Sequence, residues 1–350
     1  MAQSLEIDFL AVESGQHSGD AIAIRYGDFS SRDTQKIIII DGGTLTAGQN
    51  LVNLVRDVYG TNRVDLVLCT HLDKDHVSGL RTVVRELEVG ELWIHKPWEH
   101  SEEICHLFHD GRITTNSLAE RLKDAYNFAY ELVEIAEEKG IDIREPFAGR
   151  QFDEFTFQIL GPNVDFYREL LVNSAKTPEQ KEDTILESVM KSFTKAINWV
   201  EESIGLESLD ENGETSSENS SSAVSLLTID SNKHLFTGDA GIQSLKNVIE
   251  YSVQEGIDIS KISFMQAPHH GSKRNISPSI LDSIRCDVAY VSASSEAEKH
   301  PSRKVLNAFH RRNTKTYSTE GQNILRRRNA PIRKGYSGLE PHPFYELVQE

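Results

Sequence analysis

Cysteine, long apolar runs and net positive charge are all scarce in this sequence. It has three cysteines among 350 residues, at positions 69, 105 and 286, and no two of them have the spacing of a thiolate metal motif. Such a count fits a reducing compartment. No apolar run approaches the length that crosses a bilayer, and the opening MAQSLEIDFL carries acids where a signal peptide carries bases. We therefore expect a cytoplasmic protein with no membrane segment.

The charge balance is strongly acidic, with a net charge of −17. This argues against a general nucleic-acid coat protein, although a nuclease with locally clustered bases remains compatible with it. The 38% hydrophobic and 26% charged residues are typical of a globular protein. A chain of this length can bury a sizeable core in one large domain or two.

Four potential metal ligands follow a predicted buried strand. Residues 64–69, VDLVLC, are rich in branched apolar side chains, and His71, Asp73, Asp75 and His76 come next, before a helix opens. Divalent metals favour this mixture of nitrogen and oxygen, and a strand-to-helix turn lets the ligands converge. The stretch predicts a metal site. The alternative is a polar loop that holds two histidines and two aspartates by chance.

The segment THLDKDH resembles the H-x-H-x-D-H signature of the metallo-β-lactamase superfamily, in the form where the second histidine is aspartate. That form occurs in the nuclease domain of ComEC-type competence proteins. The resemblance implies an α/β fold, an αββα sandwich with helical insertions. We expect one domain over residues 1–335, insertions at about 97–150 and 163–218, and a tail over 336–350.

Other motifs extend the resemblance, which implies two divalent metal ions. Asp41 opens an Asp-Gly-Gly turn that supports the ligands from beneath, and Asp239 in LFTGDAG would bridge the ions. In Pro-His-His-Gly-Ser, His270 would bind metal and His269 would face the substrate, or the reverse. His300, before a proline, would line the mouth of the site. The implied metal ligands are His71, Asp73, Asp75, His76, Asp239 and His270, with catalytic roles for Asp75, His269 and His300.

A third histidine that many superfamily members place before the bridging aspartate is missing. Asn219 stands at that position, as in ComEC-like members. The first metal would then keep His71, Asp73 and Asp239, a shell richer in oxygen, so Mn²⁺ competes better with Zn²⁺. We expect a binuclear Zn or Mn site that hydrolyses its substrate with a metal-bridging hydroxide.

The resemblance favours a phosphodiester substrate, with single-stranded DNA as a candidate. Lys273 and Arg274 follow the His-His-Gly-Ser turn and could hold phosphates. Residues 301–334 add ten bases against one acid, Glu320; the bases are Arg303, Lys304, Arg311, Arg312, Lys315, Arg326, Arg327, Arg328, Arg333 and Lys334. A solvated basic face is the alternative. Rival functions are a small-molecule phosphodiester or ester hydrolase, and a protein-binding module with a relic metal core.

The insertions carry the remaining expectations. Residues 115–139 predict one long helix, capped by Ser117 and Glu120 and ended by Gly140, and a second helix runs from Thr177 to Val200. Residues 165–220 hold thirteen acids against five bases and suit a protein partner; their end, 207–222, is predicted to be a flexible loop. We expect four histidines to lie on the surface: His95, His100, His106 and His109.

Overall fold

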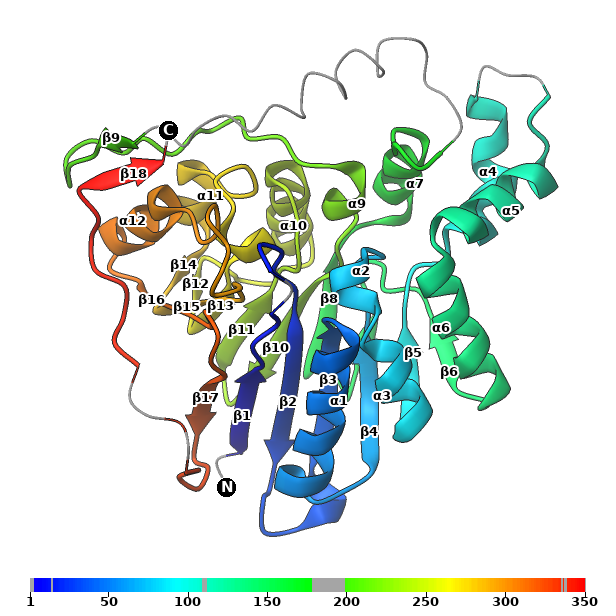
Figure 1. Ribbon diagram of the computed structural model, residues 1–350, viewed down its shortest axis with the longest axis horizontal. Helices are drawn as coiled ribbons and strands as arrows, with labels where there is room; N and C mark the ends of the chain where they lie inside the picture. The colour runs from blue at the N-terminus through cyan, green and yellow to red at the C-terminus, as the bar shows by residue number, and fades with distance from the viewer. Residues whose placement is uncertain are drawn as a thin grey trace.

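The computed structural model describes residues 3–13, 15–108, 112–177, 199–334, 336 and 339–349. Two seven-stranded sheets pack face to face, and helices cover their outer faces (Figure 1). The expected α/β sandwich is confirmed. Within the described residues, no helix combines the length and apolarity needed to cross a membrane. Cys69, Cys105 and Cys286 are free thiols.

The first sheet has the order β17-β1-β2-β3-β4-β5-β6. Its strands are β1 Ser4–Phe9, β2 Ala21–Gly27, β3 Lys36–Gly42, β4 Arg63–Leu68, β5 Glu88–Trp93, β6 Asp142–Arg144 and β17 Ile324–Arg328. The second sheet has the order β16-β15-β13-β11-β10-β8-β7. Its strands are β7 Gln151–Phe152, β8 Phe157–Gly161, β10 Val224–Ile229, β11 Asn232–Phe236, β13 Phe264–Gln266, β15 Val288–Val291 and β16 Lys315–Ser318.

Two small sheets and the helices complete the described fold. The small sheets pair β12 Lys261–Ile262 with β14 Arg285–Cys286, and β9 Trp199–Glu201 with β18 Leu347–Gln349. The α-helices are α1 Leu45–Asn53, α2 Lys74–Val77, α3 Leu80–Glu86, α4 Ser101–Ile104, α5 Thr115–Ala125, α6 Asn127–Glu138, α7 Val164–Val172, α9 Ser217–Ser220, α10 Ile242–Gln254, α11 Pro278–Ser283 and α12 Arg303–Arg311. Short 3-10 helices are η1 Arg32–Thr34, η3 Pro97–His100, η4 Cys105–Leu107 and η5 Pro268–Gly271, and η2 Leu54–Tyr59 is a short π-helix.

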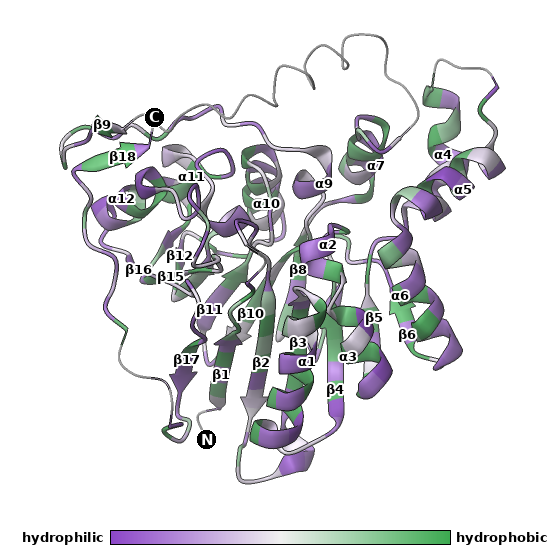
Figure 2. Ribbon diagram, viewed as in Figure 1, coloured by the Kyte–Doolittle hydropathy of each residue, from purple (hydrophilic) through white to green (hydrophobic). Residues whose placement is uncertain are grey.

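The β-branched run of β3 shows why the sandwich has three apolar layers. Ile38 and Ile40 point into the core between the sheets, whereas Ile37 and Ile39 point toward the helices that cover the first sheet. Successive side chains of a strand face opposite sides, so a strand buried on both sides must be apolar throughout. Figure 2 shows the matching pattern on the outer helices, which are hydrophobic on one side and hydrophilic on the other.

Parallel strands bring the candidate ligands to one edge of the sandwich. Strands β3, β4, β5 and β6 run parallel in the first sheet, as do β11, β13, β15 and β16 in the second. Their carboxyl ends deliver the loops that begin at Asp41, Thr70, Thr237 and Ala267. Ligands in such folds collect at the carboxyl ends of the strands.

Two glycines let these loops touch. A Cβ atom on Gly79 would lie 2.0 Å from the carbonyl oxygen of Gly42 and 2.5 Å from that of Thr44. No side chain fits in that space, so the Asp-Gly-Gly turn and the metal loop meet backbone to backbone. The predicted turn at Asp41 therefore has a packing role as well as a polar one.

Several local predictions are wrong. The helix over 115–139 is interrupted at Tyr126, whose φ/ψ of −112/39 is not helical, and its cap is Thr114 with Ser117 rather than Ser117 with Glu120. Val200 lies in β9 rather than in a helix, because it pairs with Val348. The rest of that predicted helix, at 178–198, lies outside the described residues, as does His109.

Burial overturns two further expectations. The stretch 207–222 is not simply a loop, because its end forms α9, in which Glu218 and Asn219 are buried. His95 and His100 are buried instead of exposed; His100 Nε2 lies 3.1 Å from each carboxylate oxygen of Glu145. His95 follows β5 and Glu145 follows β6, so their closeness comes from the parallel pairing of these strands. His106 is exposed, as expected. The predicted domain limits stay predictions.

Candidate metal centre

One carboxylate oxygen, Oδ2 of Asp239, lies at the centre of four imidazoles. Their Nε2 atoms are 3.8 Å away in His71, 3.6 Å in His76, 3.6 Å in His269 and 3.9 Å in His270. Asp239, His71, His76 and His270 are buried, while the side chain of His269 is 27% exposed. Residues from three separate segments of the sequence thus meet at one atom.

The backbone explains why the imidazoles point inward. His71 and His76 flank the first turn after β4, and Asp239 follows β11. His269 and His270 lie in η5 with φ angles of +46° and +55°, a conformation that side chains other than glycine adopt at a cost. The backbone of Asp239 is held by the hydroxyl of Ser222, which accepts its N–H, and by Asn275, which donates to its carbonyl.

These side chains fit divalent metal ions better than they fit one another. The four distances exceed the length of a hydrogen bond, and Nε2 of His71, His76 and His270 is buried without a partner, as is Oδ1 of Asp239. Two metal bonds of about 2.0–2.2 Å, one to nitrogen and one to oxygen, can together span such a distance. Buried polar groups normally have partners. A metal on each side of Asp239 would satisfy all of them.

The two aspartates of the metal loop lie in different surroundings. One ligand atom from each of Asp75, His76 and His270 lies within 4.8 Å of the others, which is a compact set for one ion. Asp73 turns its Oδ2 toward His71, at 3.9 Å from Nε2, and its Oδ1 toward Lys176, at 2.7 Å from Nζ. All six predicted ligands therefore face the same region, although Asp73 shares its charge with a lysine.

Asp41 holds this loop from beneath. Its Oδ1 accepts the N–H of Thr70, and its Oδ2 accepts the Thr70 hydroxyl and lies 2.8 Å from Nδ1 of His76. Both oxygens are therefore engaged, so Asp41 orients His76 rather than binding metal. Such partners fix the tautomer of a metal-binding histidine.

His269 is fixed by two asparagines. Its Nδ1 lies 3.0 Å from Oδ1 of Asn275 and 3.2 Å from Nδ2 of Asn219. The amide of Asn275 cannot turn around, because its Nδ2 donates to the carbonyl of Asp239. A proton on Nδ1 of His269 would be donated to Oδ1 of Asn275 and would leave the lone pair of Nε2 facing Asp239, whereas a hydrogen bond from Nδ2 of Asn219 needs a bare Nδ1. Asn219, at the position of the missing histidine, thus contacts an imidazole that comes from elsewhere.

Asp20, Asn275 and Lys176 belong to this region but were not predicted. Oδ2 of Asp20 accepts from Gln266 at 2.8 Å and lies 3.8 Å from Nδ1 of His76. The Gly19-Asp20 turn was the available signal for Asp20. No local pattern marks Asn275 or Lys176.

Burial dominates the electrostatics of the centre. It lowers the pKa of His71 and of His270 well below the ordinary value, and it raises the pKa of Asp239. Burial also raises the pKa of Asp20 to about 7, although His76 opposes the shift. The same burial would lower the pKa of His76, but Asp239 and Asp41 outweigh it and raise that pKa. The lowered pKa keeps His71 and His270 neutral, which is the form of imidazole that binds metal.

The family comparison agrees with this geometry. Residues 21–163 match the model of the metallo-beta-lactamase superfamily. This part of the chain is thus similar to a metallo-beta-lactamase superfamily domain. The match includes Asp41 and the metal loop. Members of this superfamily are typically metal-dependent hydrolases, and the described residues contain candidate ligand clusters for divalent ions. No curated protein matches the sequence.

Solved structures with related folds are distant. A Thermotoga maritima protein, provisionally described as a metallo-beta-lactamase, is 10% identical over 73% of this chain and 86% of its own, with a TM-score of 0.34. A mutant CmlA beta-hydroxylase is 12% identical over 93% of this chain, with a TM-score of 0.43; the match spans 54% of that protein. Both TM-scores are below 0.5, so the assignment rests on the family match and on the geometry.

The predicted substrate residues Lys273 and Arg274 share a surface hollow, and the predicted His300 lies against His269. Lys273 and Arg274 line a surface hollow of about 400 Å³ together with Lys304, opposite Asp210 and Glu214. The ring of His300 stacks against His269 with centroids 5.6 Å apart. Burial lowers the pKa of His300 to about 4, so this imidazole is neutral at pH 7. The structure thus brings His300 to the centre, beside the exposed edge of His269.

The basic stretch 301–334 is largely occupied by internal contacts. Arg311 and Arg312 pair with Glu202 and Glu207 at 3.2 and 2.8 Å, and Arg333 pairs with Asp8 at 2.6 Å. Arg328 lies 3.5 Å from Asp230, and Arg326 packs over a phenylalanine ring. The expected basic face is therefore reduced.

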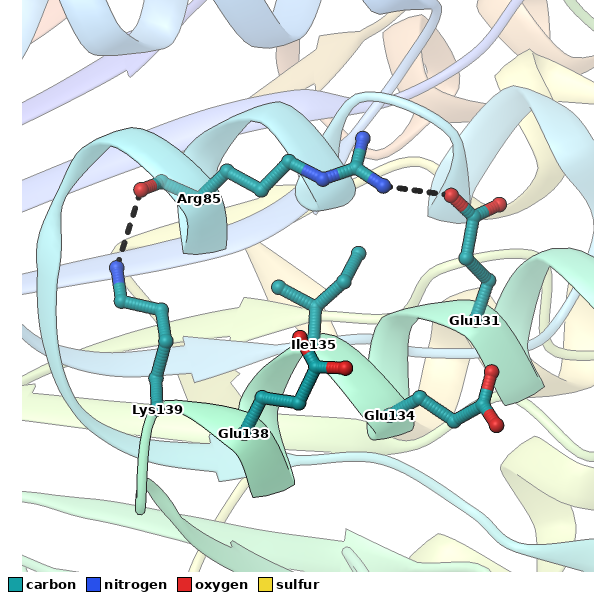
Figure 3. A pocket seen from close by; sticks show the side chains of 6 residues that line it. All are labelled: Arg85, Glu131, Glu134, Ile135, Glu138 and Lys139. Carbon is teal, nitrogen blue, oxygen red and sulfur yellow. Dashed lines mark hydrogen bonds and ion pairs between the residues drawn. The ribbon is translucent and has the colours of Figure 1, made fainter.

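Another hollow, of about 350 Å³, lies between α3 and α6 (Figure 3). Its cations are already bonded: Arg85 to Glu131 at 2.6 Å, and Lys139 to the carbonyl of Arg85 at 3.1 Å. None of the candidate site residues lines it. This hollow therefore adds nothing to the metal centre.

Proposed function

We propose that this protein is a binuclear metal-dependent hydrolase of phosphodiesters. The convergence of four imidazoles on Oδ2 of Asp239 supports the proposal most directly, because buried unpaired nitrogens around a carboxylate suit metal ions and little else. His71, Asp73 and His269 would hold the first ion, and Asp75, His76 and His270 the second, with Asp239 between them. Zn²⁺ and Mn²⁺ are the candidate ions.

The role given to His269 departs from the expectation that it faces the substrate. In the tautomer in which Nδ1 donates to Asn275, Nε2 is left to accept rather than donate. The first ion would in that case regain a nitrogen ligand in place of the missing third histidine. Zn²⁺ would then compete better than an oxygen-rich shell suggests.

Bound ions would supply Lewis acidity and lower the pKa of water, as they do in other two-metal hydrolases. The chain itself offers no competing thiol nucleophile at the centre, because Cys69 is buried and burial raises its pKa well above the ordinary value. His300 lies at the exposed edge of His269 as a neutral imidazole and could donate an N–H to the substrate.

A phosphodiester is the preferred substrate class, with single-stranded DNA as the first polymer to test. The hollow that contains Lys273, Arg274 and Lys304 supports this choice, because lysine and arginine hold phosphates. A small-molecule phosphodiester is the second candidate. The internal pairing of Arg311, Arg312 and Arg333 favours it, since a long polymer needs more free cations than the stretch 301–334 offers.

The test is hydrolysis by protein stripped with a chelator and refilled with Mn²⁺ or Zn²⁺. Substrates are fluorescent single-stranded DNA, double-stranded DNA, RNA and bis-p-nitrophenyl phosphate. Asp75→Ala should lose activity on all of them, and Asp57→Ala, which changes an exposed aspartate of η2, should keep it. Cleavage of the small ester alone would select the second candidate. If the protein holds two metal ions and hydrolyses none of these substrates, both candidate functions are refuted.

A cytoplasmic location and a protein partner on the acidic stretch 165–220 are further proposals. Part of that stretch, 178–198, lies outside the described residues. A pull-down with the full chain and with a variant whose exposed acids Asp165, Glu169 and Glu201 are neutralised would test the partner. Equal recovery of the same proteins would contradict it.

A further inference from the structure

We propose that Lys176 is the anion-binding residue on the first-metal side of the centre, where it holds a phosphate oxygen of the substrate. The inference deepens the proposed phosphodiesterase function and rests on it for the nature of the substrate. Lys176 lies in the insertion, outside the residues that carry the family resemblance. It comes 103 positions after Asp73, the carboxylate that it contacts.

The ammonium of Lys176 is aimed at the centre by two contacts. Nζ lies 2.7 Å from Oδ1 of Asp73, and it lies over the ring of Tyr126, 4.6 Å from the centroid. An ammonium over an aromatic face is attracted by the ring's electron distribution. Tyr126 itself is buried at the interruption between α5 and α6, so the platform is rigid.

The backbone around Lys176 is anchored to the helix that carries Asn219. Its N–H donates to Oγ of Ser174 at 3.0 Å, and Ser174 donates to the carboxylate of Glu218. Glu218 lies in α9, directly before the Asn219 that contacts His269. The segment that carries Lys176 is therefore tied to the same element that supports the metal ligands.

The division of the Asp73 oxygens leaves room for both a metal and the lysine. Oδ2 faces His71, whereas Oδ1 faces Lys176, so one oxygen can bind an ion while the other keeps the ammonium in place. An ammonium has three protons, and Asp73 takes one. The side chain of Lys176 is 33% exposed, so the ammonium is reachable by a substrate. A lysine beside a metal is a suitable point charge for phosphate.

The test compares Lys176→Met and Lys176→Arg with Lys123→Met as the matched control. Lys123 also pairs with an acid, Glu120 at 2.9 Å, and lies over a tyrosine, Tyr130 at 5.2 Å, but it is far from the ligands in sequence and contacts none of them in the described structure. Three quantities are measured on Mn²⁺- or Zn²⁺-loaded protein: bound metal by elemental analysis, binding of inorganic phosphate by calorimetry, and KM for bis-p-nitrophenyl phosphate.

Lys176→Met should weaken phosphate binding and raise KM by about tenfold or more, with two ions still bound, because a charged hydrogen bond is lost. Lys176→Arg should retain most of the affinity, and Lys123→Met should match the wild type. Loss of one ion with phosphate affinity otherwise unchanged would overturn the proposal, since Lys176 would then only position Asp73. Unchanged values throughout, or no phosphate binding by the wild type, would also overturn it.

The measurement of phosphate binding tests this inference separately from the proposed function. If no ester is cleaved but Lys176→Met still abolishes phosphate binding, the anion site stands and the phosphodiesterase activity fails. If esters are cleaved with an unchanged KM in Lys176→Met, the activity stands and the role of Lys176 fails.

Discussion

Nδ1 of His76 lies 2.8 Å from Oδ2 of Asp41, and the same carboxylate also receives the backbone and hydroxyl donors of Thr70. Asp41 lies at the end of β3 and Thr70 follows β4, so one side chain joins two neighbouring strand ends. Because a carboxylate only accepts hydrogen bonds, Nδ1 of His76 must carry a proton, and Nε2 is the nitrogen left for a metal ion. The Nε2 atom is the one that faces Asp239.

Asp41→Asn should weaken metal binding about 10–100-fold with little loss of folding. The amide has the shape of the carboxylate, but it can present N–H to Nδ1 of His76 and so favour the tautomer with a proton on Nε2. Competition with a chromophoric chelator measures the affinity, and the melting temperature without metal measures folding. Wild-type affinity in a folded variant would show that Asp41 does not set the tautomer.

Asn275→Leu should release His269 and lose about one of the two bound ions. Asn275→Asp should retain the first ion better, because an aspartate can still accept a proton from Nδ1 of His269, although it cannot donate to the carbonyl of Asp239. Elemental analysis after gel filtration gives the stoichiometry. Two ions in Asn275→Leu would contradict the proposed ligand role of His269.

Gly79→Ala should destabilise the fold by about 1–3 kcal/mol through overpacking. The added methyl would meet the carbonyl of Gly42 at 2.0 Å, and backbone atoms cannot move as freely as a side chain. Gly205→Ala is the control, because a Cβ there meets nothing within 4 Å. Urea unfolding of both variants measures the difference. Equal stability of the two would show that the turn and the metal loop can separate without cost.

His234→Phe should reduce the loss of stability in acid. Burial, with Arg326 and Arg328, lowers the pKa of His234 to about 3, so as the pH falls below about 6.5 the unfolded chain takes up a proton before the folded one does. The wild type therefore has full stability above this range and loses it toward pH 3. Between pH 7 and pH 5 the loss from this residue is about 2 kcal/mol.

Phenylalanine cannot titrate, and it can pack against Phe264 as His234 does, at a centroid distance of 6.0 Å. Urea unfolding at pH 7 and pH 5 gives the change for each protein. His106→Phe, at an exposed histidine, should leave the wild-type pH dependence intact. An identical pH dependence in His234→Phe would mean that His234 takes up its proton in the folded state without cost.

The sandwich and most of its strands were predictable because their signals are local. The run Lys36 to Ile40 predicts a strand from β-branching alone, and β3 is found there. The helix expected over 115–139 was wrong at Tyr126, since periodicity does not show that a side chain is drawn into a separate contact. Residues 207–222 were misjudged because a serine-rich composition hides the burial of Glu218 and Asn219 against the core.

The sequence by itself determined the ligand types and the turn that presents them, because His71, Asp73, Asp75 and His76 lie within six residues that follow a buried strand. The tertiary structure alone decided how these ligands are completed. Asp239, His269 and Lys176 lie 100 residues or more further along the chain. They reach these ligands through the parallel pairing of strands and the packing of the insertion. Composition and spacing show which side chains a chain carries. The sandwich fold decides which of them are buried together, away from water, where their polar atoms need partners.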